Sequence, residues 1–131
     1  MSLAALLAIA AGASLGAWLR WGLGLWLNPL FPSLPLGTLA ANLGGGYLMG
    51  LAMAWLGQNP ALPAELRLAL TVGFLGGLTT FSSFSGEAVT LIGRGEYLGA
   101  LAHSGAHLLG SLLMTALGMA SFQLLAAALR A

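Results

Sequence analysis

The residues best suited to chemistry lie in one stretch, Gly73 to Glu87, which has the sequence GFLGGLTTFSSFSGE. It places two adjacent glycines, several hydroxyl side chains and a carboxylate inside an otherwise apolar chain. We predict that Gly76 and Gly77 split a helix there into two half-helices, because glycine adopts backbone angles that a helix does not. Backbone groups freed inside a membrane must face a protein-lined cavity, and such cavities hold ions or substrates.

The expected break offers ligands for a cation. The first half-helix would end in unpaired carbonyls, which suit a hard cation such as Na⁺. Thr79, Thr80 or Ser82 would cap the amides that open the second half-helix. If a twofold axis of a dimer passes through this point, each carbonyl is duplicated, and the two subunits would enclose one central monovalent cation.

The residues after the break suit an anion. Phe81 and Phe84 are three residues apart and therefore share a helix face. Aromatic rings carry a positive edge, and Ser83 and Asn42 add hydroxyl and amide donors. Together these groups could contact a small anion in a narrow polar track without binding it too tightly for conduction. Packing in the core is the alternative role of the two rings.

A second polar row follows at a spacing of four residues, which places its members on one helical face: His103, His107, Ser111 and Thr115. Polar residues at membrane depth tend to face interior water or a transport path, with interhelical hydrogen bonding as the alternative. A histidine pair at this spacing could also bind zinc. However, a metalloprotease helix has glutamate after the first histidine, and Ser104 stands there, so zinc catalysis is not expected.

Composition indicates which elements must position these residues. Hydrophobic residues make up 59% of the 131 positions, charged residues 5%, and the mean hydropathy is +0.94, which indicates an integral membrane protein. A crossing needs about 20 apolar residues, so the chain has room for about four helices and no separate soluble domain. We therefore predict a single all-α transmembrane domain over residues 1–131, with helices at about 3–27, 36–56, 66–92 and 97–129. Cysteine is absent, which excludes disulfides and thiolate metal sites.

The distribution of charge predicts no fixed orientation. The chain has no lysine, and its four arginines divide evenly between the two expected faces, Arg20 and Arg94 on one and Arg67 and Arg130 on the other. We therefore expect dual topology and an antiparallel homodimer in the cell (inner) membrane, surrounded by lipid and without a nucleic-acid partner. An orientation set by other features is the alternative. The glycine rows Gly12, Gly16, Gly24 and Gly46, Gly50 are best interpreted as helix-packing faces.

Three sets of residues form a combined pattern along nearly the whole chain. They are Gly16 to Arg20 (GAWLR), Gly37 to Leu39 (GTL) with Asn42, Gly45, Tyr47 and Gly50, and Gly73 to Ser85. This pattern resembles the motifs of the fluoride channel family, the small dual-topology Fluc/CrcB proteins. The resemblance implies passive export of toxic cytoplasmic fluoride through two pores in an antiparallel dimer.

The resemblance also implies roles for individual residues. A buried structural Na⁺ would be held by the backbone carbonyls of Gly76 and Thr79 from both subunits. The remaining roles would be pore aromatics at Phe81 and Phe84, pore donors at Asn42 and Ser83, a polar track at His103 and Ser111, and a vestibule arginine at Arg20.

Two ionisable residues need separate interpretation. His107 stands where the family more often has a small hydroxyl residue, and we hypothesise that it makes conduction sensitive to pH, because histidine gains charge within the physiological range. Glu87 lies about one helical turn beyond Phe84. A carboxylate within a span needs a partner or water, and Arg20 is a candidate partner, so we expect a vestibule or structural role for Glu87.

Other functions fit the sequence less well. A small proton-coupled multidrug exporter would need a carboxylate in its first helix, and none lies between Leu3 and Leu27. A noncatalytic membrane assembly subunit could use the glycine faces, but it would not require both the break and the polar track. An enzyme is not expected, because no nucleophile, base and orienting group form a recognisable set.

Overall fold

The computed structural model describes residues 2–31 and 34–130, and this part of the chain is helical without any strand. Four segments are long and apolar enough to cross a membrane: Leu3–Leu30, Leu36–Gln58, Ala64–Gly93 and Tyr97–Ala128. The prediction of an all-α membrane protein with four such helices is confirmed. The helices of these segments are α1 (Leu3–Leu27) with η1 (Asn28–Leu30), α2 (Leu36–Gln58), then α3 (Ala64–Leu68), the π-helical η2 (Ala69–Leu75), α4 (Gly76–Leu78) and α5 (Phe81–Gly93), and last α6 (Tyr97–Ala128).

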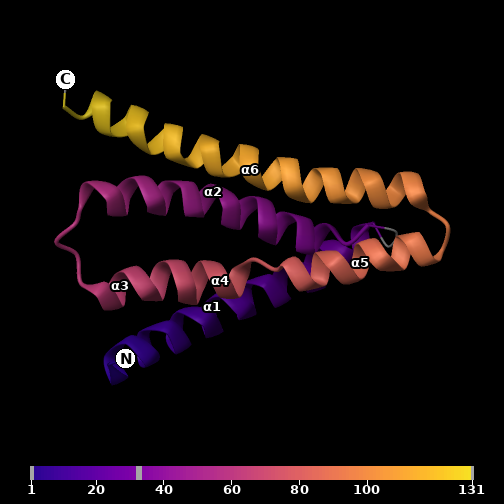
Figure 1. The fold of residues 1–131 in the computed structure, drawn as a ribbon, viewed down its shortest axis with the longest axis horizontal. Coiled ribbons are helices and arrows are strands. Elements are labelled where there is room, and N and C mark those ends of the chain that lie inside the picture. Colours follow the sequence, from indigo (N-terminus) through magenta and orange to yellow (C-terminus); the bar gives the residue numbers. More distant parts are fainter. Residues whose placement is uncertain (1, 32–33, 131) are drawn as a thin grey trace.

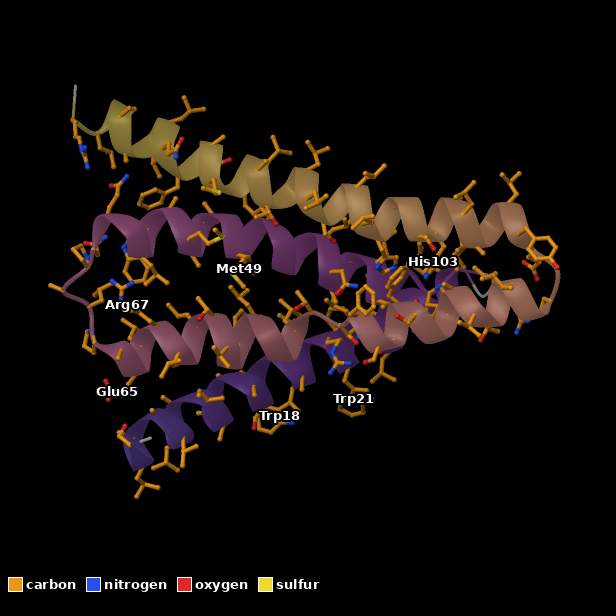
Figure 2. All side chains as sticks on the ribbon, viewed as in Figure 1. Trp18, Trp21, Met49, Glu65, Arg67 and His103 are labelled. Atoms are coloured by element: carbon orange, nitrogen blue, oxygen red, sulfur yellow. The ribbon has the colours of Figure 1, made fainter. Side chains whose placement is uncertain are left out.

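The segments pack in two main pairs (Figure 1). Helix α2 lies along α6, and α1 crosses η2 and α4. Helix α5 packs against the start of α6, which follows it after a tight turn. The N- and C-terminal ends lie at the same end of the molecule, as expected for an even number of crossings. Trp18 and Trp21 project from α1 away from the other helices (Figure 2).

Local sequence explains where the helices begin and end. Ser2 caps α1, since its Oγ accepts a hydrogen bond of 3.1 Å from the amide of Ala5. Pro35 and Pro63 immediately precede α2 and α3, where a residue without an amide hydrogen is tolerated. The tight turn between α5 and α6 contains Gly95, whose φ of 76° is accessible mainly to glycine.

Glycines allow both helix pairs to pack closely. A methyl group added at Gly16 of α1 would lie 2.1 Å from the carbonyl oxygen of Phe74, and one at Gly50 of α2 would lie 2.0 Å from that of Thr115. Such distances leave no room for a side chain, so backbone meets backbone at these points. The interpretation of these two glycines as packing residues is confirmed.

The extended backbone in the third segment lies beyond its glycine pair. Gly76 and Gly77 are helical, whereas Thr79 (φ −83°, ψ 155°) and Thr80 (φ −151°, ψ 120°) are extended. The prediction that the glycines themselves interrupt the helix is therefore wrong in its position. Gly77 instead serves close packing, because a Cβ there would lie 2.5 Å from the carbonyl oxygen of Ala13 in α1.

Candidate functional site

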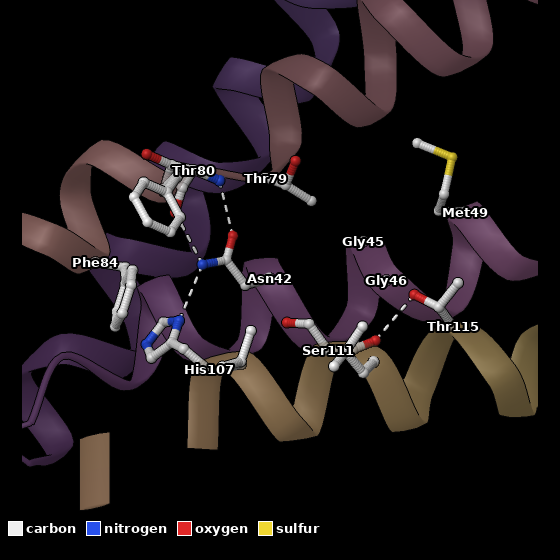
Figure 3. Close-up of a pocket in the computed structure, with 13 residues that line it drawn as sticks. Asn42, Gly45, Gly46, Met49, Thr79, Thr80, Phe84, His107, Ser111 and Thr115 are labelled. Atoms are coloured by element: carbon white, nitrogen blue, oxygen red, sulfur yellow. Dashed lines mark hydrogen bonds between the residues drawn. The ribbon is translucent and has the colours of Figure 1, made fainter. Parts of the chain in front are cut away.

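The amide of Asn42 ties α2 to the extended residue Thr80 (Figure 3). Its Oδ1 accepts from the Thr80 N–H at 2.7 Å, and its Nδ2 donates to the Thr80 carbonyl at 2.9 Å. A backbone donor and a backbone acceptor together leave one possible assignment of the amide nitrogen and oxygen. The same Nδ2 lies 2.9 Å from Nδ1 of His107 on α6, so Asn42 connects three segments at one point.

Side chains bind two backbone amides that lack their helical acceptors at the extended residues. In a continuous helix the Thr80 amide would bind the Gly76 carbonyl and the Ser83 amide would bind the Thr79 carbonyl. Here the Thr80 amide donates to Asn42, and the Ser83 amide donates at 3.1 Å to the Thr80 Oγ1, which caps α5. Thr80 is thus the cap among the three candidates. The carbonyls of Gly76 and Thr79 have both lost their usual helical donors.

Four rings form a continuous aromatic cluster across α5 and α6. Phe81 meets Phe84 edge to face at 5.3 Å between ring centroids, and Phe84 stacks on His107 at 4.8 Å. Phe84 also lies 5.6 Å from His103, and the two histidine rings are 4.5 Å apart. Phe81 is 78% exposed, whereas both histidines are buried. The cluster therefore runs from an open face of the chain into its interior.

Glu87 contacts α2 and α6. Its Oε1 accepts a hydrogen bond of 2.5 Å from the hydroxyl of Thr38, and its Oε2 lies 3.3 Å from Nε2 of His103. Arg20 on α1 instead donates from Nε to the carbonyl of Gly77 at 3.1 Å. Arg20, the candidate partner of Glu87, does not pair with it among the described residues, because each residue uses a different partner on a different helix.

An open groove of about 360 Å³ lies where α4 meets α5, between these helices and α2 and α6 (Figure 3). Its lining includes six of the residues predicted to contact ions: Asn42, Thr79, Phe81, Phe84, His107 and Ser111. A second cavity of about 390 Å³ is lined by Arg20 and Ser83, together with Thr38 and residues of α1.

The predicted residues thus occupy three neighbouring places. Gly76 lies at the start of α4 and does not line the groove, whereas Glu87 and His103 belong to the contacts between α5 and α6. His103 points into the space between these two helices (Figure 2). Ser83 departs from the expected grouping, because it faces the Arg20 cavity and not the groove that holds Asn42 and the phenylalanines.

Two threonines have a larger part in the site than the sequence indicated. Thr38 holds Glu87, and Thr80 both caps α5 and makes two hydrogen bonds to Asn42. The spacing of four between Thr38 and Asn42 placed Thr38 on the right helix face, and this was the available signal. Its partner on α5 is set by the tertiary arrangement.

Comparisons with known proteins agree over most of the chain. The model of the family described as CrcB-like protein, Camphor Resistance (CrcB), matches residues 7–119. A protein of Nitrosospira multiformis named fluoride-specific ion channel FluC is 60% identical over 126 residues, covering 96% of this chain and 98% of that protein. Proteins of the same name from Pseudomonas putida (59% identical, covering 92% of this chain and 94% of that protein) and Thiobacillus denitrificans (55%, covering 92% and 98%) are also similar.

Proposed function

We propose a function on the premise that this chain belongs to the CrcB-like protein family, whose model matches residues 7–119 of its 131. It is a multi-pass membrane protein and a fluoride channel, hence a transporter and not an enzyme. In our proposal it lets cytoplasmic fluoride leave passively across the cell inner membrane. Hydrogen fluoride enters cells as a neutral acid and dissociates, so a selective pore for the anion would limit its toxicity.

The groove beside Thr79 and Thr80 is the observation that carries this proposal. It brings the rings of Phe81 and Phe84 together with the hydroxyl of Ser111 on α6, whereas the amide of Asn42, whose hydrogens face Thr80 and His107, forms part of the groove wall. Positive ring edges and neutral donors attract a small anion without the strong binding of a fixed cationic charge. Arg20, in the adjacent cavity, supplies the positive potential that would draw anions toward this region.

A structural Na⁺ forms the second part of the proposal. The carbonyls of Gly76 and Thr79 fit such an ion, because their usual helical donors bind Asn42 and the Thr80 hydroxyl instead. Neutral backbone oxygens suit a hard monovalent cation, as in other transport proteins with discontinuous helices. When bound, the ion would supply fixed positive charge near the phenylalanine rings.

An antiparallel homodimer is the third part of the proposal. The groove is open in a single subunit, and Phe81 at its edge is 78% exposed. A second copy related by a twofold axis in the membrane plane would cover this face and bring the same two carbonyls of both subunits to one cation. The even division of arginines and the absence of lysine suit insertion in both orientations.

Fluoride efflux from proteoliposomes, followed with a fluoride electrode, tests the proposed activity. We expect rapid efflux of fluoride and negligible efflux of chloride under the same gradient. Equal rates for the two anions would contradict selectivity, and the absence of fluoride efflux would contradict the channel.

Reporters that are active on only one side of the membrane, fused to the C-terminus, test dual topology. We expect signal from both sides with a functional protein. A one-sided signal would overturn the antiparallel arrangement.

Replacing Na⁺ by a large organic cation during purification tests whether the protein needs a structural Na⁺. The dimers should then dissociate or lose fluoride flux. Unchanged dimers with unchanged flux would argue against a structural Na⁺.

A further inference from the structure

Three ionisable side chains meet at the junction of α5 and α6. One ligand atom each from Glu87, His103 and His107 lies within 4.8 Å of the other two. The histidines share one face of α6 because they are four residues apart, and the tight turn before α6 brings Glu87 of α5 opposite them. We propose that these residues form a binding site for one divalent transition-metal ion of the Zn²⁺ class.

The buried atoms of this cluster point to a ligand. Both histidines are only 4% exposed, and among the described residues neither Nε2 atom nor the Glu87 Oε2 has a hydrogen-bond partner. The 3.3 Å separation of Glu87 Oε2 and His103 Nε2 is within ion-pair distance but does not form a hydrogen bond. Buried polar atoms without partners are destabilising and uncommon. A shared metal ion would satisfy all three at once.

The ligand types and their spacing suit zinc. Two imidazoles and one carboxylate are a known zinc set that leaves a fourth position open. Tetrahedral zinc with bonds of about 2.0–2.1 Å separates its ligand atoms by roughly 3.3 Å, so shifts of about 1–2 Å would close the present cluster around an ion. The Thr38 hydroxyl holds Oε1 of Glu87 at 2.5 Å, an outer hydrogen bond of the kind that orients metal-binding carboxylates.

The contact between Asn42 and His107 predicts how a change at position 42 should alter metal affinity. Because its Nδ2 is committed to the Thr80 carbonyl and also faces Nδ1 of His107, Nδ1 is the acceptor and the neutral ring carries its proton on Nε2. Metal binding at Nε2 would move that proton to Nδ1 and break the bond from Asn42. The Asn42 amide therefore lowers the affinity of the site for a metal ion. A hydrogen-bond acceptor at position 42 should raise that affinity.

This site is separate from the proposed Na⁺ position. It uses two imidazole nitrogens, which prefer borderline metals, and a carboxylate, whereas the proposed Na⁺ ligands at Gly76 and Thr79 are backbone carbonyl oxygens. Phe84 stacks on His107, so an ion held here would also lie beside the proposed anion path. Inhibition of fluoride flux by Zn²⁺ is the expected consequence, and this consequence alone rests on the proposed function.

Binding to the purified full-length protein, isolated with a histidine-free affinity tag, tests the site. We expect Co²⁺ to give the intense visible absorption of tetrahedral coordination, saturating at one ion per chain and displaced by Zn²⁺. His103→Gln, His107→Gln and Glu87→Gln should each weaken Zn²⁺ binding by about tenfold or more in calorimetry. Glu96→Gln is the matched control, because it removes an exposed carboxylate at the start of α6. This variant should bind Zn²⁺ as the wild type does.

Asn42→Asp tests the sign of this effect in a variant first shown to fold, because its carboxylate can accept from Nδ1–H of His107 but no longer donates to the Thr80 carbonyl. We expect this variant to bind Zn²⁺ about tenfold more tightly than the wild type. Absence of the Co²⁺ band, or equal Zn²⁺ affinity in the wild type and all three ligand variants, would overturn the site. These measurements need no fluoride flux, so they test the metal site even if the protein fails to conduct fluoride.

Discussion

Two regions of the molecule use similar polar residues in different ways. Around Thr80, polar side chains bond between segments, as Asn42 does with Thr80 and Thr38 with Glu87. Elsewhere, hydroxyls bond to the carbonyl four residues earlier in their own helix, as in Ser14, Thr71, Thr115 and Ser121. A hydroxyl group within an apolar helix can therefore form its hydrogen bond with the backbone of its own helix. Bonds between segments distinguish the region around Thr80 from the rest of the membrane-spanning helices, whereas the bonds of Arg67, Arg130 and Asn28 to other segments lie at helix ends.

The largest effect is expected from Asn42→Ala. It removes two hydrogen bonds to Thr80 and the contact with His107, which should lower the free energy of unfolding by roughly 3 kcal/mol and fluoride efflux by at least about tenfold. Asn59→Ala is the matched control, because its Nδ2 bonds only locally to the carbonyl of Trp55. Similar losses of efflux in both variants would contradict the distinction between the two regions.

The next effect concerns the aromatic rings. Phe81→Ile and Phe84→Ile keep apolar bulk but remove the ring edge, so each should reduce fluoride efflux by about threefold to tenfold. Phe122→Ile, near the end of α6 and outside the groove lining, should leave efflux unchanged. If both groove variants conduct as the wild type does, the rings serve packing alone.

A stability effect without a role in ion binding is expected at Gly50. A methyl group there meets the Thr115 backbone at 2.0 Å, so Gly50→Ala should separate α2 from α6 and destabilise the protein by about 1–3 kcal/mol. Gly57 on the same helix has open space around its Cβ position, and Gly57→Ala should be neutral or slightly stabilising. Thermal unfolding in detergent compares the two, and equal melting temperatures would argue against close packing at Gly50.

The smallest effect is expected from Ser121→Ala. The exposed Ser121 hydroxyl bonds only to the Leu117 carbonyl of its own helix, so its loss should change stability by less than about 0.5 kcal/mol. Thr38→Val should lower the free energy of unfolding by about 1–3 kcal/mol, because it leaves the Glu87 carboxylate without its hydroxyl donor. The comparison of regions would fail if chemical unfolding ranked Ser121→Ala as the more damaging change.

The sequence predicted a departure from helical geometry in the third segment but not its exact position. The polar stretch from Gly73 to Glu87 does contain the extended residues, yet they are Thr79 and Thr80 and not the glycines. Conformational freedom made Gly76 and Gly77 plausible, but freedom alone does not fix a conformation. Asn42, far away in sequence, holds the extended backbone, while Gly77 remains helical against α1.

The sequence by itself determined the four apolar helices, the glycine faces and the polar rows on α2 and α6, because these depend on composition and on the helical period. Only the tertiary structure decided which rows meet. It joined Glu87 to Thr38 and His103 and left Arg20 with the Gly77 carbonyl. The physical reason is that hydrogen bonds between helices depend on how the helices rotate and cross, and close glycine contacts, several of them beside the groove, set that arrangement.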